Sequence, residues 1–196
     1  ELENKYGGTF PDEQKKKILN YYGLFITSFL CSNYTKLYGR TLTDAERKRA
    51  TLFGILTPVG DDLFDVDKLD TERIHLITYD PQNYTATTFS ANVAKEIQSF
   101  LLADVPHKEA YLLAAKNVLD IQIETARQTN PAIAEQELEY ITYMKGAASV
   151  IIYHQCLDDV AGEQMKEALF YTGSLFQLGN DIFDLYKDVR DHIYTL

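Results

Sequence analysis

The sequence predicts an all-α fold. Apolar residues recur at helical spacing along most of the chain, and no stretch sustains the two-residue alternation of a half-buried strand. Proline and glycine divide these patterns into separate segments. With 45% hydrophobic residues among 196, the chain can form one globular domain with a core of its own. We therefore expect a single helical domain over residues 1–196, without a sheet.

Seven helices are expected. Thr43-Asp44-Ala45-Glu46 has the sequence of a capping box, which opens the second helix. Pro58 lies within that helix and predicts a kink, because proline removes one backbone hydrogen bond. Asn130 as N-cap, with Pro131 at the first helical position, opens the sixth. The expected ranges are 12–38, 44–65, 70–79, 88–103, 107–128, 132–156 and 162–191.

The last helix carries two distinct faces. One is a broad apolar stripe whose members recur at i, i+3, i+4 and i+7. They are Met165, Ala168, Leu169, Thr172, Leu175, Phe176, Ile182, Phe183 and Tyr186. The other is a polar strip, ~100–120° around the helix, formed by Gln177, Asn180, Asp184 and Asp188. We expect the stripe to pack in the core and the strip to line a cavity. Gly173 either leaves room for a ligand there or allows close helix packing.

Composition and charge exclude several classes of function. A net charge of −10 disfavours nucleic acid as a partner, because most of the surface would repel its phosphates. The longest apolar run, near 23–31, is much shorter than the ~20 residues of a membrane span, so no transmembrane segment is expected. Nothing near Glu1 resembles a cleavable signal. Cys31 and Cys156 are too few for a disulfide framework, and we expect free thiols in a cytoplasmic protein.

Two acidic segments, each within a helical pattern, are expected to form the two halves of a divalent-metal site. In the second segment, Asn180, Asp184 and Asp188 are spaced i, i+4, i+8 and so project from one face of a helix. In the first, Asp61 and Asp65 are one turn apart, with Asp62 displaced by about 100°. All of these side chains offer oxygen ligands.

Oxygen ligands without His or Cys partners suit a hard ion, and Mg²⁺ prefers a few carboxylates plus substrate phosphate. The expected substrate is therefore a phosphorylated molecule. An EF-hand loop that starts at Asp61 is excluded, because Leu63 and Val66 stand where an acidic or amide residue and a Gly are needed. A di-iron carboxylate bundle needs two Glu-x-x-His pairs, and only Glu72-Arg73-Ile74-His75 fits.

Together these motifs resemble those of the class I isoprenoid synthases, which comprise terpene synthases, trans-prenyltransferases, and squalene and phytoene synthases. Asp61-Asp62-x-x-Asp65 is similar to the superfamily's first motif, DDxxD. Asn180, Asp184 and Asp188 fall where terpene synthases have an Asn, Ser/Thr, Glu triad, with Asp in the last two places. The same stretch also resembles the QLxNxxxDxxxD of squalene and phytoene synthases and the FQxxDDxxD of chain-elongating prenyltransferases.

The resemblance implies the fold, the metal and the substrate. The expected fold is the class I terpenoid synthase helical bundle with a central active-site cavity, and the sequence looks truncated at its C-terminus because that fold continues with further helices. The implied ligands are three Mg²⁺ ions and a prenyl diphosphate, and a homodimer is one possible assembly. The expected metal ligands are Asp61, Asp65, Asn180, Asp184 and Asp188. Asp62 and Asp181 either bind metal directly or support the ligands from outside.

Three cations are candidates for contact with the diphosphate. Lys145 occupies a position similar to the lysine of the prenyltransferases' diphosphate-contacting helix. Lys187 and Arg190 flank the second motif, and the guanidinium fork of Arg190 matches phosphate oxygens. The alternatives are a solvent-facing lysine for Lys145 and a surface charge pair for Arg190.

The function expected is that of a terpene synthase or cyclase, which ionises an allylic prenyl diphosphate to a carbocation with the help of Mg²⁺. Ordinary chain elongation is disfavoured, because the chain lacks the Arg pair after the first motif and the N-terminal Gly-Lys-x-Arg element of that branch. One alternative is head-to-head coupling of the squalene or phytoene synthase type. Another, of a different class, is a non-catalytic helical protein that binds an isoprenoid or a partner.

Overall fold

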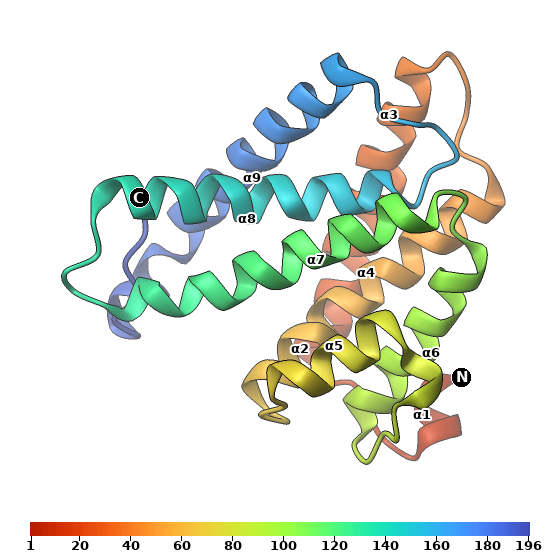
Figure 1. Cartoon of the computed structure of the whole chain (residues 1–196), viewed down its shortest axis with the longest axis horizontal. Coiled ribbons are helices and arrows are strands. Elements are labelled where there is room, and N and C mark those ends of the chain that lie inside the picture. Colours follow the sequence, from red (N-terminus) through yellow and green to blue (C-terminus); the bar gives the residue numbers. More distant parts are fainter. The chain divides into compact units, whose positions relative to one another are not determined.

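The structure is a computed structural model that describes residues 1–196, and it contains helices but no β-strand (Figure 1). The all-α prediction is therefore confirmed. The α-helices are α1 (Leu2–Tyr6), α2 (Asp12–Lys16), α3 (Ser32–Leu37), α4 (Asp44–Asp65), α5 (Thr71–Tyr79), α6 (Phe89–Asp104), α7 (Lys108–Glu124), α8 (Glu135–His154) and α9 (Glu163–Arg190). A π-helix, η1 (Lys17–Cys31), and two 3₁₀ helices, η2 (Pro81–Asn83) and η3 (Thr125–Thr129), complete the chain. None of the helices combines the length and apolar character needed to cross a membrane.

The chain folds as two compact units. Unit 1 comprises Glu1–Lys108 and Cys156–Asp159, and unit 2 comprises Glu109–Gln155 and Val160–Leu196. The first acidic motif belongs to unit 1 and the second to unit 2. The single domain expected from the sequence stays a prediction.

All seven expected helices have counterparts, with two local differences. The first expected helix, 12–38, consists of α2, η1 and α3 in succession. Within η1 the rings of Tyr21 and Phe25 stack at 5.9 Å between centroids, and those of Phe25 and Phe29 at 5.7 Å. Hydrophobic periodicity read as an α-helix does not reveal the π-helical winding. The short helix α1 was not expected.

The two capping predictions had different outcomes. Thr43 and Glu46 form the expected capping box at the start of α4. Asn130 does not cap α8; its side chain accepts a hydrogen bond from the Ala132 N–H at 3.0 Å, and the helix begins only at Glu135. The Asn-Pro pair therefore forms a turn before the helix, as the local bonding of Asn side chains allows.

Unit 1 is built around α4, which packs against η1 and α6. Its buried apolar residues come from all three helices. They include Ile26 and Leu30 of η1, Phe53, Val59 and Leu63 of α4, and Val93, Ile97 and Leu101 of α6. α4 continues without a break through Pro58, so the buried stretch leads directly to the acidic motif at its C-terminal end.

A buried carboxylate, Glu46, ties the 156–159 segment to α4. Glu46 is fully buried and accepts hydrogen bonds from Arg40 and from the backbone N–H of Asp158, both at 2.8 Å. Arg49 donates to the Cys156 carbonyl at 2.8 Å and pairs with the Asp158 carboxylate at 2.5 Å. Asp159 pairs with Arg40. Asp158 and Asp159 are therefore members of an ion-pair network.

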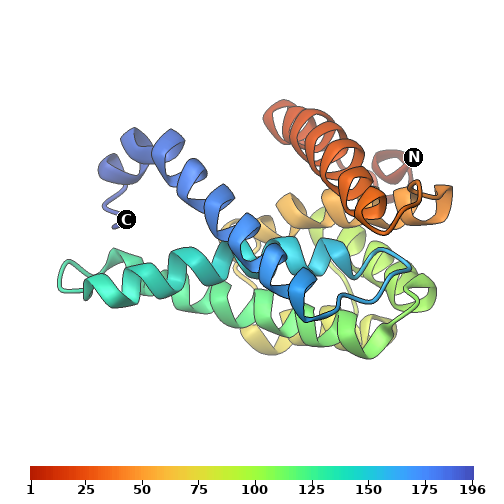
Figure 2. The same cartoon turned by 90° about the horizontal axis from the view of Figure 1, so that it is seen from above.

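Unit 2 is built on the crossing of α8 and α9, which Figure 2 shows from above. Gly146 and Gly173 meet at the crossing. A Cβ added to Gly146 would lie 2.0 Å from the Gly173 carbonyl oxygen, and one added to Gly173 would lie 2.3 Å from that of Gly146. Of the two roles expected for Gly173, close helix packing is the one that the structure uses. On the other side of α8, Ile121, Ile141 and Ala148 form a small apolar cluster.

Candidate functional site

The first acidic motif lies in the last turn of α4. The helix ends at Asp65, and the N–H of Asp67 bonds to the Asp62 carbonyl at 2.9 Å. Lys68 follows with a positive φ of 51°, so the chain turns immediately after the motif. Asp61 and Asp65 are exposed, whereas Asp62 is half-buried. Three carboxylates thus stand at the end of a helix where the partial charge is already negative, a setting that favours a cation.

Gln14 of α2 holds the middle carboxylate of this motif. Its Nε2 donates to Asp62 Oδ2 at 2.8 Å and to the Pro58 carbonyl at 3.2 Å. The amide therefore contacts both the backbone of α4 and the acidic side chain one turn later. No sequence signal pointed to Gln14, which lies 48 residues away from Asp62 along the chain.

Tyr22 of η1 lies within the electrostatic range of Asp61. Burial is the main cause that raises the pKa of the Tyr22 hydroxyl, and the negative charge of Asp61 adds to it. The hydroxyl therefore keeps its proton beside the motif. Sequence analysis did not single out this tyrosine.

The second acidic motif lies on the half of α9 that follows the Gly173 crossing. Asp181 and Asp188 are buried, Asp184 is half-buried and Asn180 is exposed. The four predicted residues of this motif therefore differ widely in exposure. Asp181, expected either as a ligand or as a supporting residue, is the most closely held of them.

Asp181 has hydrogen-bond partners on both carboxylate oxygens. Gln177 Nε2 donates to Oδ1 at 2.7 Å, and the Thr142 hydroxyl of α8 donates to Oδ2 at 3.4 Å. Burial raises the pKa of Asp181, and the Gln177 bond and the charge of Lys145 offset this only in part. The carboxylate is therefore oriented, but it lacks a direct ion pair that would fully stabilise its charge.

Asp188 is the second buried acid of this motif. Burial, followed by the charge of Asp184, raises its pKa, while Lys187 and Lys145 act in the opposite direction. Two carboxylates one turn apart thus repel each other with insufficient positive charge nearby. A divalent cation bound at Asp184 and Asp188 would relieve that repulsion, so this donor set fits a hard ion.

Lys145 of α8 belongs electrostatically to the second motif. Its charge stabilises the ionised forms of both Asp181 and Asp188, although it forms a direct ion pair with neither. The side chain is half-buried. Both expected roles of Lys145, contact with the diphosphate and a solvent-facing lysine, stay predictions.

The two other predicted cations are exposed. Arg190 donates from Nε to Asp191 Oδ1 at 2.8 Å and from Nη2 to Oδ2 at 3.2 Å. This is a surface charge pair of the kind that the sequence left open, formed with the adjacent residue. Lys187 is exposed on the last turns of α9, where its charge lowers the pKa of Asp188.

The expected orientation of α9 is wrong over its C-terminal half. Ile182, Phe183 and Tyr186, predicted to face the core, are 72%, 89% and 94% exposed. The buried positions of this half are Asp181 and Asp188. The reason is the glycine crossing, which fixes the rotation of α9 about its axis. It turns Asp181, which bonds to Thr142 of α8, inward and leaves the apolar stripe of this half exposed. Amphipathic periodicity predicts two faces but does not say which one a neighbouring helix will cover.

No group of three or more His, Cys, Asp or Glu side chains is gathered closely enough to hold a metal ion. In each motif one carboxylate, that of Asp62 or that of Asp181, accepts a hydrogen bond from a neutral glutamine amide. The predicted ligand set of Asp61, Asp65, Asn180, Asp184 and Asp188 therefore stays a prediction.

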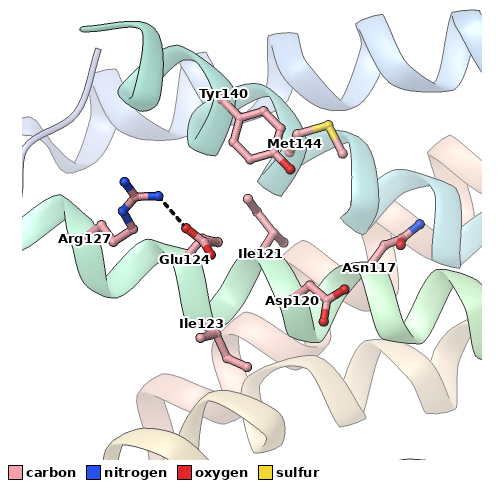
Figure 3. Close-up of a pocket in the computed structure, with 8 residues that line it drawn as sticks. All are labelled: Asn117, Asp120, Ile121, Ile123, Glu124, Arg127, Tyr140 and Met144. Atoms are coloured by element: carbon pink, nitrogen blue, oxygen red, sulfur yellow. Dashed lines mark hydrogen bonds and ion pairs between the residues drawn. The ribbon is translucent and has the colours of Figure 1, made fainter. Parts of the chain in front are cut away.

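Unit 2 contains a cavity of about 550 Å³ (Figure 3). α7, η3 and α8 supply its walls, and Figure 3 shows the ion pair between Arg127 and Glu124, 2.9 Å long, at one end. Both apolar and polar side chains line it. They are Asn117, Asp120, Ile121, Ile123, Glu124, Arg127, Tyr140 and Met144. None of the predicted site residues lines this cavity.

No family model, curated protein or solved structure matches the chain.

Proposed function

We propose that the protein is a Mg²⁺-dependent class I isoprenoid synthase, a terpene synthase that ionises an allylic prenyl diphosphate to a carbocation. The observation that carries the proposal is the acidic strip of α9 beside Lys145. There Asp184 and Asp188 repel each other, while a lysine acts on the same strip. Carboxylates that need a cation, next to an ammonium group that can contact phosphate oxygens, suit a metal-bound diphosphate.

The proposal assigns metal-binding, diphosphate-binding and carbocation-stabilising roles to different residues. Asp61 and Asp65 in unit 1, and Asn180, Asp184 and Asp188 in unit 2, would hold Mg²⁺. When bound, Mg²⁺ supplies stabilisation of the negative charge that develops on the departing diphosphate. Lys145 would donate hydrogen bonds to the diphosphate, with Lys187 as a second, exposed donor. Aromatic side chains would stabilise the hydrocarbon cation by their ring faces.

Turnover of defined substrates tests the proposal. The full chain is incubated with Mg²⁺ and with prenyl diphosphates of increasing length, and released diphosphate and extracted hydrocarbons are measured. We expect diphosphate release that stops in chelator and is restored by Mg²⁺. Absence of release with every chain length would favour the non-catalytic alternative.

Calorimetric titration with inorganic diphosphate separates binding from turnover. Because the protein carries a net charge of −10, its surface should repel the ligand unless metal is present. We expect measurable affinity only with Mg²⁺. Equal affinity in chelator would contradict a metal-mediated site.

Head-to-head coupling is the second candidate, and Asp184 is the residue that favours it. Its carboxylate matches the Asp of the squalene and phytoene synthase pattern, whereas terpene synthases have a neutral hydroxyl there. Its charge also acts directly on Asp188. A product that joins two prenyl chains would identify this branch, and a product with the carbon number of one substrate would identify a terpene synthase.

A further inference from the structure

The two acidic motifs share an arrangement that their sequences do not display. Each motif contains a pair of adjacent polar residues, Asp61-Asp62 or Asn180-Asp181, and the second residue of the pair accepts a hydrogen bond from a glutamine amide. Gln14 Nε2 lies 2.8 Å from Asp62 Oδ2, and Gln177 Nε2 lies 2.7 Å from Asp181 Oδ1. The glutamine comes from a separate helix in unit 1 and from the preceding turn of the same helix in unit 2. The same contact is thus made by two different routes.

We propose that Gln14 and Gln177 are positioning residues, which orient Asp62 and Asp181 respectively and leave the neighbouring acids of each motif to bind a divalent cation. This inference rests on the proposed function. It assigns Asp62 and Asp181 to the support of the ligands, a choice that the sequence left open. It also adds Gln14, which no motif contains, to the site.

The chemistry of the amide explains why glutamine suits this role. Its NH₂ group donates to a carboxylate but carries no charge. The aspartate is therefore held in one orientation while the motif keeps its full negative charge for a cation. A lysine or arginine in the same place would form an ion pair and cancel part of that charge. Outer hydrogen-bond partners of this kind commonly affect metal affinity.

Each glutamine is itself held in place. The amide of Gln14 donates to both Asp62 and the Pro58 carbonyl, so the side chain is bonded to the backbone of α4 as well as to the carboxylate. Gln177 packs over the glycine crossing, where a Cβ on Gly146 would lie 2.8 Å from the Cβ of Gln177. Its partner Asp181 is held from the other side by Thr142. Both contacts are therefore made by side chains with restricted freedom.

Metal binding by the full chain tests the inference. Free Mn²⁺ is followed by electron paramagnetic resonance during titration in the presence of inorganic diphosphate. Gln14→Met and Gln177→Met keep the length of the side chain but remove its donors. We expect each to weaken Mn²⁺ binding about 10-fold, the lower end of the range for outer hydrogen-bond partners.

Two other glutamines provide matched controls. Gln98 donates to the Thr78 carbonyl at 2.8 Å in unit 1, and Gln128 donates to the Tyr194 carbonyl at 2.9 Å in unit 2. Gln98→Met and Gln128→Met also remove buried amide bonds, so they should lower the melting temperature. They should leave Mn²⁺ affinity unchanged. An equal loss of affinity in the controls would mean that the effect is one of general stability and would overturn the proposal.

Double-mutant cycles test whether each glutamine acts through its aspartate. In an Asp62→Asn background, Gln14→Met should have no further effect on Mn²⁺ affinity, and the same should hold for Gln177→Met in Asp181→Asn. Additive losses would overturn the positioning role. If a Met variant does not fold, as circular dichroism will show, truncation of the glutamine to Ala replaces it in the same cycle.

The outcomes separate this inference from the proposed function. If the wild-type chain binds Mn²⁺ and diphosphate but the glutamine variants bind them equally well, positioning is overturned and the proposed function is not. If the wild-type chain binds neither, the proposed function fails and this inference fails with it.

Discussion

The carbonyl oxygen of Gly173 lies only 2.0 Å from the point where a Cβ on Gly146 would have to stand. The backbones of α8 and α9 are therefore in direct contact, and neither position accepts a side chain without a shift of one helix. This contact determines which side of α9 faces α8. It places Asp181 and Asp188 in the interface and turns Phe183 and Tyr186 outward.

Alanine at position 173 should destabilise unit 2. The added methyl group would overlap the Gly146 backbone, and overpacking of this kind costs about 1–3 kcal/mol or more. Gly179 is the matched control, because an added Cβ there meets nothing within 4 Å. Gly179→Ala should raise the free energy of unfolding by about 0.4–1 kcal/mol, since alanine favours the helix. Urea unfolding of both variants measures the difference, and equal effects would contradict the crossing.

Phe183 should contribute little to stability despite its size. With 89% of its surface exposed, Phe183→Ala should change the free energy of unfolding by no more than about 0.5 kcal/mol. Leu169, fully buried on the same helix, is the control, and Leu169→Ala should cost about 2–5 kcal/mol. A loss of several kcal/mol for Phe183→Ala would show that the apolar stripe is covered, as the sequence predicted.

Glu46 should make the protein sensitive to acid. Burial alone would raise the pKa of its carboxyl, but hydrogen bonds from Arg40, Asp158 and Thr43 outweigh it and lower the pKa to about 2. Because the folded-state pKa lies below the ordinary value of about 4.3, the stabilisation is present above that value. It is lost as the pH falls from about 4.3 toward 2.

The variant Glu46→Gln isolates this contribution. It should be less stable than wild type at pH 7, by about 1–3 kcal/mol, because buried donors lose a charged acceptor. Its stability should also fall less steeply in acid. Glu163→Gln is the control, since Glu163 is 89% exposed and pairs only with Lys166. Unfolding curves at several pH values with the same slope in wild type and Glu46→Gln would contradict this assignment.

Asp61→Asn should reduce turnover strongly and leave the fold intact. The change removes the charge of one proposed metal ligand at an exposed position and creates no cavity. Glu72→Gln removes a charge from an exposed helix position of the same unit and should have no effect on turnover. The rate of diphosphate release, with circular dichroism as the check on folding, provides the comparison. Equal rates in both variants would mean that the first motif is only a solvated helix end.

If the proposed function holds, substitutions at Asp184 should distinguish a terpene synthase from a head-to-head enzyme. In a terpene synthase, Asp184→Ser should keep an oxygen ligand and measurable activity, whereas Asp184→Ala should lose the ligand. In a head-to-head enzyme the negative charge itself is needed, so Ser and Ala should be similarly inactive. Single-turnover diphosphate release measures both variants. Wild-type rates in both would contradict the metal-binding role of this residue.

Local rules account for what was predictable in the candidate site. Asp184 and Asp188 share a helix and lie one turn apart, so their mutual repulsion follows from sequence spacing alone. Gln177 and Asp181 are also one turn apart, and their hydrogen bond belongs to the same class of contact. The role of Gln14 could not be predicted from the sequence, because its partner Asp62 belongs to a different helix. Tyr22 was missed for the same reason.

The all-α class, the position of the long helices and the capping box at Thr43 could be predicted from the amino-acid sequence, because they depend on periodicity and on contacts within a few residues. The buried face of α9 could not be predicted in this way, because it is set by packing between helices. The buried face depends on the backbone contact between Gly146 and Gly173. A glycine in a helical segment does not indicate which other helix will contact it, so the sequence did not predict this contact. The tertiary structure also decided that Glu46 and Asp158 belong to one network, since they lie 112 residues apart in the chain. Contacts of this kind are made by packing, which brings together residues whose sequence neighbourhoods carry no information about one another.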